Sequence, residues 1–133
     1  MPALRDQPRV LIVEDDAVTA LMLSTLMAEM GVEVIGLAST GPRGVALADY
    51  HRPDLALVDV NLAKGTDGMK AARQMRRELK LPVVLVSGTE PSDRTDWEGE
   101  ELPLIRKPFD SGQIKSAVRR LLGQRMAEAV AVS

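Results

Sequence analysis

The sequence predicts one α/β domain built on a five-stranded parallel sheet. Short apolar runs of strand length alternate with segments that repeat apolar residues at helical spacing, which is typical of strands joined by crossover helices. The chain has 133 residues, of which 45% are hydrophobic and 2% aromatic. That length suits a single core, which must consist mainly of aliphatic side chains and methionine.

The predicted strands are short, and most of them are apolar throughout. Continuous apolar runs indicate strands that are buried on both faces. The second run is more mixed in polarity, which suits a strand at the edge of the sheet. We expect strands at residues 10–13, 32–38, 54–60, 82–87 and 102–107.

The helices between these strands are recognised by their apolar faces. In the first, Leu23, Leu26, Met27 and Met30 share one face, and Gly31 follows as a favourable C-terminal residue. Asp16 is the expected N-cap of the first helix, and Asp110 or Ser111 that of the last. We expect helices at residues 17–30, 41–52, 69–79 and 110–122.

Residues 88–101 depart from this alternation. They hold Pro91, two glycines and many acids, and Trp97 is their only large apolar side chain. Because no apolar stripe is present, we expect only a short or mobile helix there. The basic residues in the preceding helix are interpreted as a solvated face; they are Arg73, Arg76, Arg77 and Lys80.

Right-handed crossovers between parallel strands favour the strand order 2-1-3-4-5, a flavodoxin-like (βα)5 sandwich of three layers. We expect this domain to cover residues 9–122. An N-terminal extension, residues 1–8, precedes it, and a C-terminal tail, residues 123–133, extends or frays the last helix. In such a sheet, ligands bind beyond the carboxyl ends of the first and third strands.

Composition excludes several classes of function. The chain has no cysteine, so disulfides, thiolate metal sites and a cysteine nucleophile are excluded. A net charge of -2 gives no indication of direct nucleic-acid binding. No apolar run approaches the roughly 20 residues of a membrane helix, and the N-terminus lacks the apolar region of a signal peptide. We therefore expect a cytoplasmic protein without membrane contacts.

Acidic residues follow the strands that flank the predicted binding edge. Glu14, Asp15 and Asp16 follow the first strand, and Asp59 ends the third, with Asn61 two residues later. A buried carboxylate is costly unless it is paired or bound to metal, and a second one nearby adds repulsion. A hard divalent cation relieves both costs. Oxygen ligands without thiolates suit Mg²⁺ or Ca²⁺, and open water positions favour Mg²⁺ beside a phosphate.

A hydroxyl and an ammonium group follow the last two strands. Ser87 ends the fourth, with Gly88 and Thr89 after it, and Lys107 follows the fifth, with Pro108 after it. Because parallel strands end at one edge of the sheet, these groups are expected to meet the carboxylates there.

The motifs LIVED, PDLALVDVNL with TDG, PVVLVSG and LIRKPF occur in this order. Together they resemble the receiver domain of bacterial two-component response regulators, over about residues 9–122. The resemblance implies a phosphoprotein that takes a phosphoryl group from a sensor histidine kinase or a phosphotransfer protein. It implies a signalling domain and not an enzyme, although such a domain promotes its own phosphorylation and slow dephosphorylation.

The resemblance also implies roles for the acidic residues. Asp59 is the phosphoacceptor and a ligand of Mg²⁺. Asp15 is the direct ligand of the acid pair, whereas Glu14 acts largely through water. Asn61 gives its backbone carbonyl to the metal. Asp16, which follows Asp15, has no implied role in the site and is expected only to cap the first helix.

The remaining implied residues bind the phosphoryl group or limit access to it. Ser87 binds one phosphoryl oxygen and Lys107 pairs with another, which is electrostatic stabilisation by preorganised groups. Pro108 is expected to follow a cis peptide bond that aims Lys107 into the site. Gly88 leaves the site open to a donor. Asn61 and Thr89 flank the line of attack and are expected to tune the lifetime of the acyl phosphate.

One position departs from the common receiver pattern. Leu104 stands where many receivers have a switch aromatic. The SGT sequence after the fourth strand is similar to a subgroup of single-domain receivers with a Thr/Ser-Gly motif. We therefore expect the output to run through reordering of residues 88–101. The first helix is the expected docking element for the phosphodonor, the downstream partner is a protein, and the chain is a monomer or weak dimer.

Three alternatives differ in chemistry or in output. A phosphate sink or shuttle in a phosphorelay has the same site and lacks an output partner. A flavodoxin-like FMN binder needs a Ser/Thr/Gly-rich phosphate loop where this chain has VEDDAV, whose carboxylates would repel a phosphate. A phosphatase of the haloacid dehalogenase type would have an acid where this chain has Asn61.

Overall fold

Five parallel strands form the centre of the computed structural model, which describes residues 7–62 and 67–132. Their order is β2-β1-β3-β4-β5, as the sequence predicts. The strands are Arg9–Val13 (β1), Glu33–Ala38 (β2), Leu55–Asp59 (β3), Val83–Ser87 (β4) and Leu104–Arg106 (β5). Of the predicted terminal segments and the loop before the third helix, residues 1–6, 63–66 and 133 lie outside the described residues.

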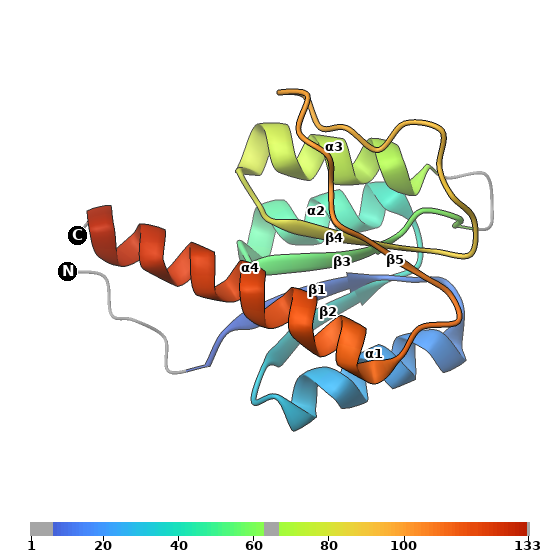
Figure 1. Cartoon of the computed structure of the whole chain (residues 1–133), viewed down its shortest axis with the longest axis horizontal. Coiled ribbons are helices and arrows are strands. Elements are labelled where there is room, and N and C mark those ends of the chain that lie inside the picture. The colour runs from blue at the N-terminus through green and yellow to red at the C-terminus, as the bar shows by residue number, and fades with distance from the viewer. Residues whose placement is uncertain (1–6, 63–66, 133) are drawn as a thin grey trace.

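Helices cover both faces of this sheet. Figure 1 shows α2 and α3 over one face and α1 and α4 over the other, so the predicted three-layer α/β architecture is confirmed. The helices are Ala17–Glu29 (α1), Gly41–His51 (α2), Gly68–Leu79 (α3) and Ser111–Val132 (α4).

The alternation of side chains along the strands decides which polar groups meet. Successive side chains of a strand point to opposite faces. In β3, Val58 packs in the core below α2 and α3, whereas Leu57 packs in the core below α1 and α4. Asp59 therefore follows on the α1 and α4 side. The same alternation beyond β1 and β5 brings Glu14 and Lys107 to that side.

Polar caps fix where α1 and α4 begin. The Asp16 carboxylate accepts hydrogen bonds from the backbone N–H, at 3.1 Å, and the hydroxyl of Thr19, which confirms its predicted N-cap role. These bonds lower the pKa of Asp16. Before α4, the Asp110 carboxylate accepts from the Gly112 N–H, and the Asp110 N–H donates to the Gln113 side chain. This reciprocal pattern is similar to a capping box, with the N–H of the second helical residue in place of that of the third.

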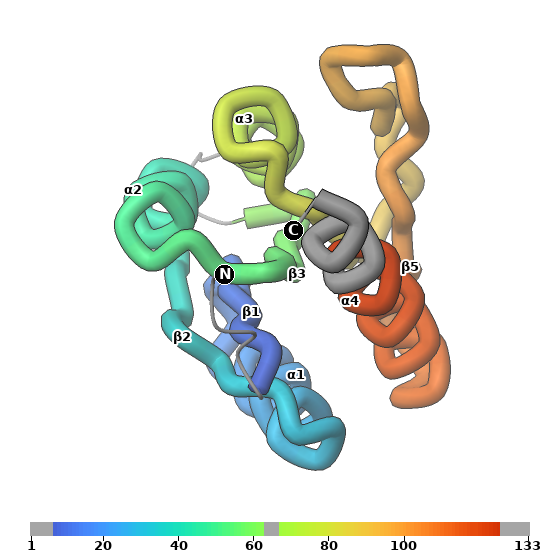
Figure 2. The backbone as a smooth tube through the Cα atoms, turned by 90° about the vertical axis from the view of Figure 1, so that its left-hand side faces the viewer, coloured from blue at the N-terminus to red at the C-terminus, as the bar shows by residue number. Residues whose placement is uncertain are grey.

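The connection between β4 and β5 contains no helix. All residues from 88 to 103 are described and none is helical, so the expectation of a short helix there is wrong. Figure 2 shows this crossover as a long excursion beside α3. Side chains replace helical hydrogen bonds within it: the buried Asp96 carboxylate accepts from the backbone N–H groups of Glu98 and Glu100.

The basic cluster, interpreted from the sequence as a solvated face, includes the exposed Lys80, but three of its four residues also contact the crossover. These three hold the crossover. The Arg73 guanidinium donates to the carbonyls of Asp93 at 2.9 Å and Thr95 at 3.0 Å, Arg76 lies 3.7 Å from the Asp96 carboxylate, and the Lys80 ammonium lies 4.5 Å from the Trp97 ring centroid.

The last helix is longer than the predicted element. It continues past Leu122 to Val132, so the described part of the predicted tail is helical. Among the helices of residues 7–62 and 67–132, none is long and apolar enough to cross a membrane.

Candidate functional site

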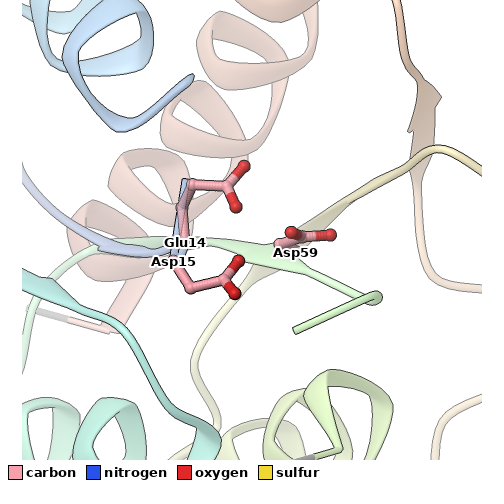
Figure 3. Close-up of side chains that lie close together, drawn as sticks. All are labelled: Glu14, Asp15 and Asp59. Atoms are coloured by element: carbon pink, nitrogen blue, oxygen red, sulfur yellow. The ribbon is translucent and has the colours of Figure 1, made fainter. Parts of the chain in front are cut away.

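Three carboxylates gather at the carboxyl ends of β1 and β3. One oxygen each of Glu14, Asp15 and Asp59 lies within 4.8 Å of the others. In Figure 3 the side chains of Glu14 and Asp15 leave the end of β1 towards the end of β3, where Asp59 lies. Glu14 is 5% exposed and Asp59 3% exposed, so water screens their charges poorly.

Lys107 compensates part of this negative charge. Its Nζ lies 2.8 Å from Glu14 Oε1 and 3.4 Å from Asp59 Oδ2. Its backbone N–H donates to the Ser87 carbonyl at 2.7 Å, which continues the pairing of β5 with β4 and fixes the base of the side chain. The Lys107–Pro108 peptide bond is cis, in agreement with the expectation from the resemblance.

Burial and charge shift the pKa of two groups in this cluster. Burial is the largest cause that raises the pKa of Glu14 to about 7, and the hydrogen bond and charge of Asp59 add to it, while Lys107 opposes it. Burial lowers the pKa of Lys107, but the hydrogen bond to Glu14 and the charges of Asp59 and Glu14 outweigh it. The net effect raises the pKa of Lys107, so the ammonium form is favoured.

A second polar group, here called the hydroxyl cluster, consists of Ser87, Thr89 and the Asn61 side chain. Ser87 Oγ lies 2.8 Å from Asn61 Oδ1 and 2.5 Å from the Thr89 carbonyl, and it accepts from the Thr89 N–H at 3.1 Å. The Thr89 hydroxyl lies 3.3 Å from the same Asn61 oxygen. Ser87 is fully buried, whereas Asn61 and Thr89 are exposed.

Asn61 joins the hydroxyl cluster to the carboxylates. Its backbone N–H donates to Asp59 Oδ1 at 2.9 Å, while its side chain contacts Ser87. The structure therefore brings Glu14, Asp59 and Lys107 into direct contact. It places the Ser87 hydroxyl next to Asn61 and Thr89. Asn61, which contacts both Ser87 and Asp59, links this hydroxyl to the Asp59 carboxylate.

Two further predicted positions, Gly88 and Leu104, border open space and the apolar core respectively. A side chain added at Gly88 would meet no atom within 4 Å, so this side of the site is open. Leu104 is half-buried and packs against the core below α2 and α3. An aliphatic side chain therefore occupies the position of the switch aromatic.

Sequence reasoning did not find two residues next to the site. A Cβ at Gly68, the first residue of α3, would lie 2.0 Å from the Asp59 carbonyl oxygen, so only glycine allows this approach. The Arg106 guanidinium donates to the Gly88 carbonyl at 3.3 Å and pairs with Glu90. Gly68 is the last residue of the TDG motif. The motif alone does not show that this glycine packs against the backbone of Asp59.

The donor set is suited to a hard cation. Glu14, Asp15 and Asp59 form a group that could hold a metal ion, and they offer only carboxylate oxygens. Such oxygens favour Mg²⁺, Ca²⁺ or Mn²⁺ over softer metals.

Known proteins share this sequence pattern. The Phyllosphere-induced regulator PhyR of Methylorubrum extorquens is 31% identical over 114 residues, which are 85% of this chain and 43% of the relative. The Transcriptional regulatory protein LiaR of Bacillus subtilis is 33% identical over 115 residues, which are 84% of this chain and 54% of the relative. The chain thus spans about half the length of these relatives.

Solved structures share the fold. The response regulator PhyR from Brucella abortus superposes with a TM-score of 0.80 at 25% identity, over 95% of this chain and 52% of that one. The receiver domain of a putative Luxo repressor protein from Vibrio parahaemolyticus superposes with a TM-score of 0.83 at 18% identity, over 96% and 98%. The family described as "Response regulator receiver domain" matches residues 10–119. This chain therefore belongs to the response regulator receiver domain family.

Proposed function

We propose that Asp59 accepts a phosphoryl group from a phosphohistidine of a sensor histidine kinase or a phosphotransfer protein. The observation that carries this proposal is the convergence of Glu14, Asp15 and Lys107 on a carboxylate that is 3% exposed. Desolvated charges of both signs, held in place before any ligand arrives, are suited to stabilise charge on a transferred phosphoryl group.

The proposed step needs no covalent chemistry beyond one substitution at phosphorus. An Asp59 carboxylate oxygen forms a bond to phosphorus while the P–N bond to the donor imidazole breaks, and the imidazole nitrogen keeps the electron pair and takes a proton. The product is an acyl phosphate. The Lys107 ammonium, which lies 3.4 Å from Asp59 in the unphosphorylated structure, would neutralise the charge of the phosphoryl oxygens. The Ser87 hydroxyl would donate a hydrogen bond to one of these oxygens. The domain thus acts as a phosphoryl acceptor and not as an enzyme on a separate substrate.

We propose Mg²⁺ as the cofactor of this step. The carboxylates of Asp15 and Asp59 and the backbone carbonyl of Asn61 would hold it directly, and Glu14 would act through water. When bound, the ion supplies positive charge against the phosphoryl oxygens. The all-oxygen donor set supports this choice.

The surface of α1 is the proposed docking element for the phosphodonor. Val18, Leu21 and Met22 are 66%, 67% and 48% exposed. Leu21 and Met22 line a groove of about 330 Å³, which Leu26 and Phe109 also border. Because α1 begins two residues after Asp15, an apolar helix seated on this face would lie close to the site. We propose that output also passes through contact with a protein partner, in the bacterial cytoplasm and without direct nucleic-acid binding.

Labelling with a small phosphodonor tests the acceptor role. The native chain incubated with acetyl phosphate and Mg²⁺ should gain one phosphoryl group, detected by intact mass, and Asp59→Asn should gain none. Equal labelling of the two proteins would show that Asp59 is not the acceptor.

Two neighbouring acids provide matched variants for the metal. Asp15→Asn should lose the Mg²⁺ dependence of labelling together with most of the labelling. Asp16→Asn removes the neighbouring charge, which the structure assigns to the cap of α1, and should be labelled like the native chain. Identical behaviour of these two variants would contradict the assignment of Asp15 as a ligand.

A further inference from the structure

The Ser87 hydroxyl is engaged before any phosphoryl group is present. A hydroxyl has one proton to donate. Ser87 Oγ lies within donor distance of two acceptors, Asn61 Oδ1 at 2.8 Å and the Thr89 carbonyl at 2.5 Å, and its lone pair accepts from the Thr89 N–H. The side chain is fully buried, so water does not compete for this proton. Contacts within the hydroxyl cluster therefore already use the only side-chain donor of Ser87.

Asn61 contacts both groups that the phosphoryl group must meet. Its backbone N–H is bound to Asp59 Oδ1, and its side-chain oxygen lies next to the hydroxyls of Ser87 and Thr89. One residue thus holds the orientation of the acceptor carboxylate and that of the neighbouring hydroxyl.

We propose that Asn61 is a positioning residue that holds the Ser87 proton away from Asp59 and competes with the phosphoryl group for it. This inference rests on the proposed function, because it concerns the same acceptor. The charged phosphoryl oxygen is the stronger acceptor, since hydrogen bonds to charged groups are about twice as strong as neutral ones. Asn61 is an exposed residue, so water can replace Ser87 as the partner of its side-chain oxygen once that bond breaks.

The competition should reduce the affinity for a phosphoryl group by a small factor. In Asn61→Ala the Ser87 proton still has the Thr89 carbonyl as an acceptor, so only part of the competition is lost. We expect a gain in affinity of about threefold, the size of a weak net hydrogen bond.

Beryllofluoride provides the test, because it mimics a phosphoryl group on a carboxylate without hydrolysis. Its affinity in the presence of Mg²⁺ is measured by calorimetry on the full chain, for the native protein, Asn61→Ala, Ser87→Ala and the double variant. Asn61→Ala should bind about threefold more tightly than the native chain. In the Ser87→Ala background the same substitution should change nothing, since no proton remains to be held.

A second readout follows the hydroxyl itself. The Thr89 N–H donates to Ser87 Oγ, so its NMR chemical shift should move when beryllofluoride draws the hydroxyl away. In Asn61→Ala without beryllofluoride, this shift should already have moved part of the way. An equal effect of Asn61→Ala with and without the Ser87 hydroxyl, or no effect at all, would overturn the positioning role. Beryllofluoride binding to Asp59→Asn as tight as to the native chain would instead overturn the proposed function.

Discussion

At the residue scale, the run Glu14, Asp15, Asp16 is tolerated because its three carboxylates have different surroundings. Glu14 is buried against Lys107, and Asp15 lies within the group of carboxylates that could hold a metal. Asp16 caps α1, and its backbone N–H donates to Glu14 Oε2 at 3.3 Å. Charge pairing and a helix N-terminus thus stabilise two of the adjacent acids, and the third lies where a bound cation would stabilise it.

Glu14 should make the stability of the metal-free chain depend on pH. Its folded pKa of about 7 lies above the ordinary value of 4.5, so between these values the folded state binds more protons than the unfolded state. The free energy of unfolding therefore falls as pH rises through this window, by at most about 1.4 kcal/mol per pH unit. Urea denaturation in EDTA at pH 5, 6 and 7 measures this slope.

Glu14→Gln is the control for this prediction. It keeps the shape of the side chain and cannot titrate, so its stability should change less over the same range than that of the native chain. Added Mg²⁺ should restore stability to the native chain most strongly at pH 7, where Glu14 is more often charged. An identical slope for the variant and the native chain would contradict the role of Glu14.

The sequence predicted the charged part of the site better than its hydrogen bonds. Asp59 ends an apolar strand, so its carboxylate needs compensation wherever the chain folds. The ammonium and the other carboxylates were predicted beside it because parallel strands end at the same edge of the sheet. The partners of Ser87 could not be predicted, because a hydroxyl selects among acceptors that only the folded turn brings within 3 Å.

At the element scale, the connection of β3 to α3 sets the position of Asp59. α3 begins at Gly68 directly against the backbone of Asp59: an added Cβ would meet the Asp59 carbonyl oxygen at 2.0 Å and the Val60 Cα at 3.0 Å. All these atoms belong to the backbone, so the contact cannot be relieved by rotating a side chain. A larger residue must move either the end of β3 or the start of α3.

Gly68→Ala should therefore weaken both stability and phosphorylation. Overpacking of this kind costs about 1–3 kcal/mol in the free energy of unfolding. Gly123→Ala is the matched control, because it lies inside α4 with open space around its Cβ, and it should gain up to about 1 kcal/mol from helix propensity. Urea denaturation of both variants, with acetyl phosphate labelling, checks the prediction. Native-like stability of Gly68→Ala would contradict the contact.

The elements that the sequence predicted are those with a clear apolar period. The five strands and the helices covering them were found because continuous or helical apolar patterns persist over their length. The β4–β5 crossover was not, because it has no apolar period: its order comes from hydrogen bonds within its own turns and from contacts with α3. Its turns are held by the Asp96 carboxylate and by arginines of α3, a helix whose basic face gave no sign of a partner.

At the scale of the whole molecule, the β4–β5 crossover connects the site to α3. Its first residues belong to the site, since Thr89 contacts Ser87 and the Gly88 carbonyl accepts from Arg106. Its middle is bound to α3 through Arg73, which contacts Asp93 and Thr95. A change in the orientation of Ser87 therefore acts on one end of a segment whose middle is held by side-chain contacts with α3.

A phosphoryl mimic should reorder this crossover. When beryllofluoride draws the Ser87 hydroxyl towards Asp59, the bonds between Ser87 and Thr89 break, and amide hydrogen exchange in residues 88–101 should change. Trp97, the only tryptophan, lies in this segment under the Lys80 ammonium, so its fluorescence should change as well. Unchanged exchange and fluorescence on saturation with beryllofluoride would refute this coupling.

Loosening the anchor on α3 should produce part of this change without a phosphoryl mimic. Arg73→Ala removes two hydrogen bonds to the crossover, about 1–2 kcal/mol, and should speed exchange in residues 93–97 by about tenfold. Arg77→Ala is the matched control, because Arg77 is an exposed arginine of the same helix and its ion pair, with Glu78, lies wholly within α3. The two variants have the same charge, so faster exchange in Arg73→Ala alone would show that the order of the crossover depends on its contacts with α3. Equal exchange in both would mean that the crossover is ordered by its own turns, and that its response to beryllofluoride arises at Ser87 without a contribution from α3.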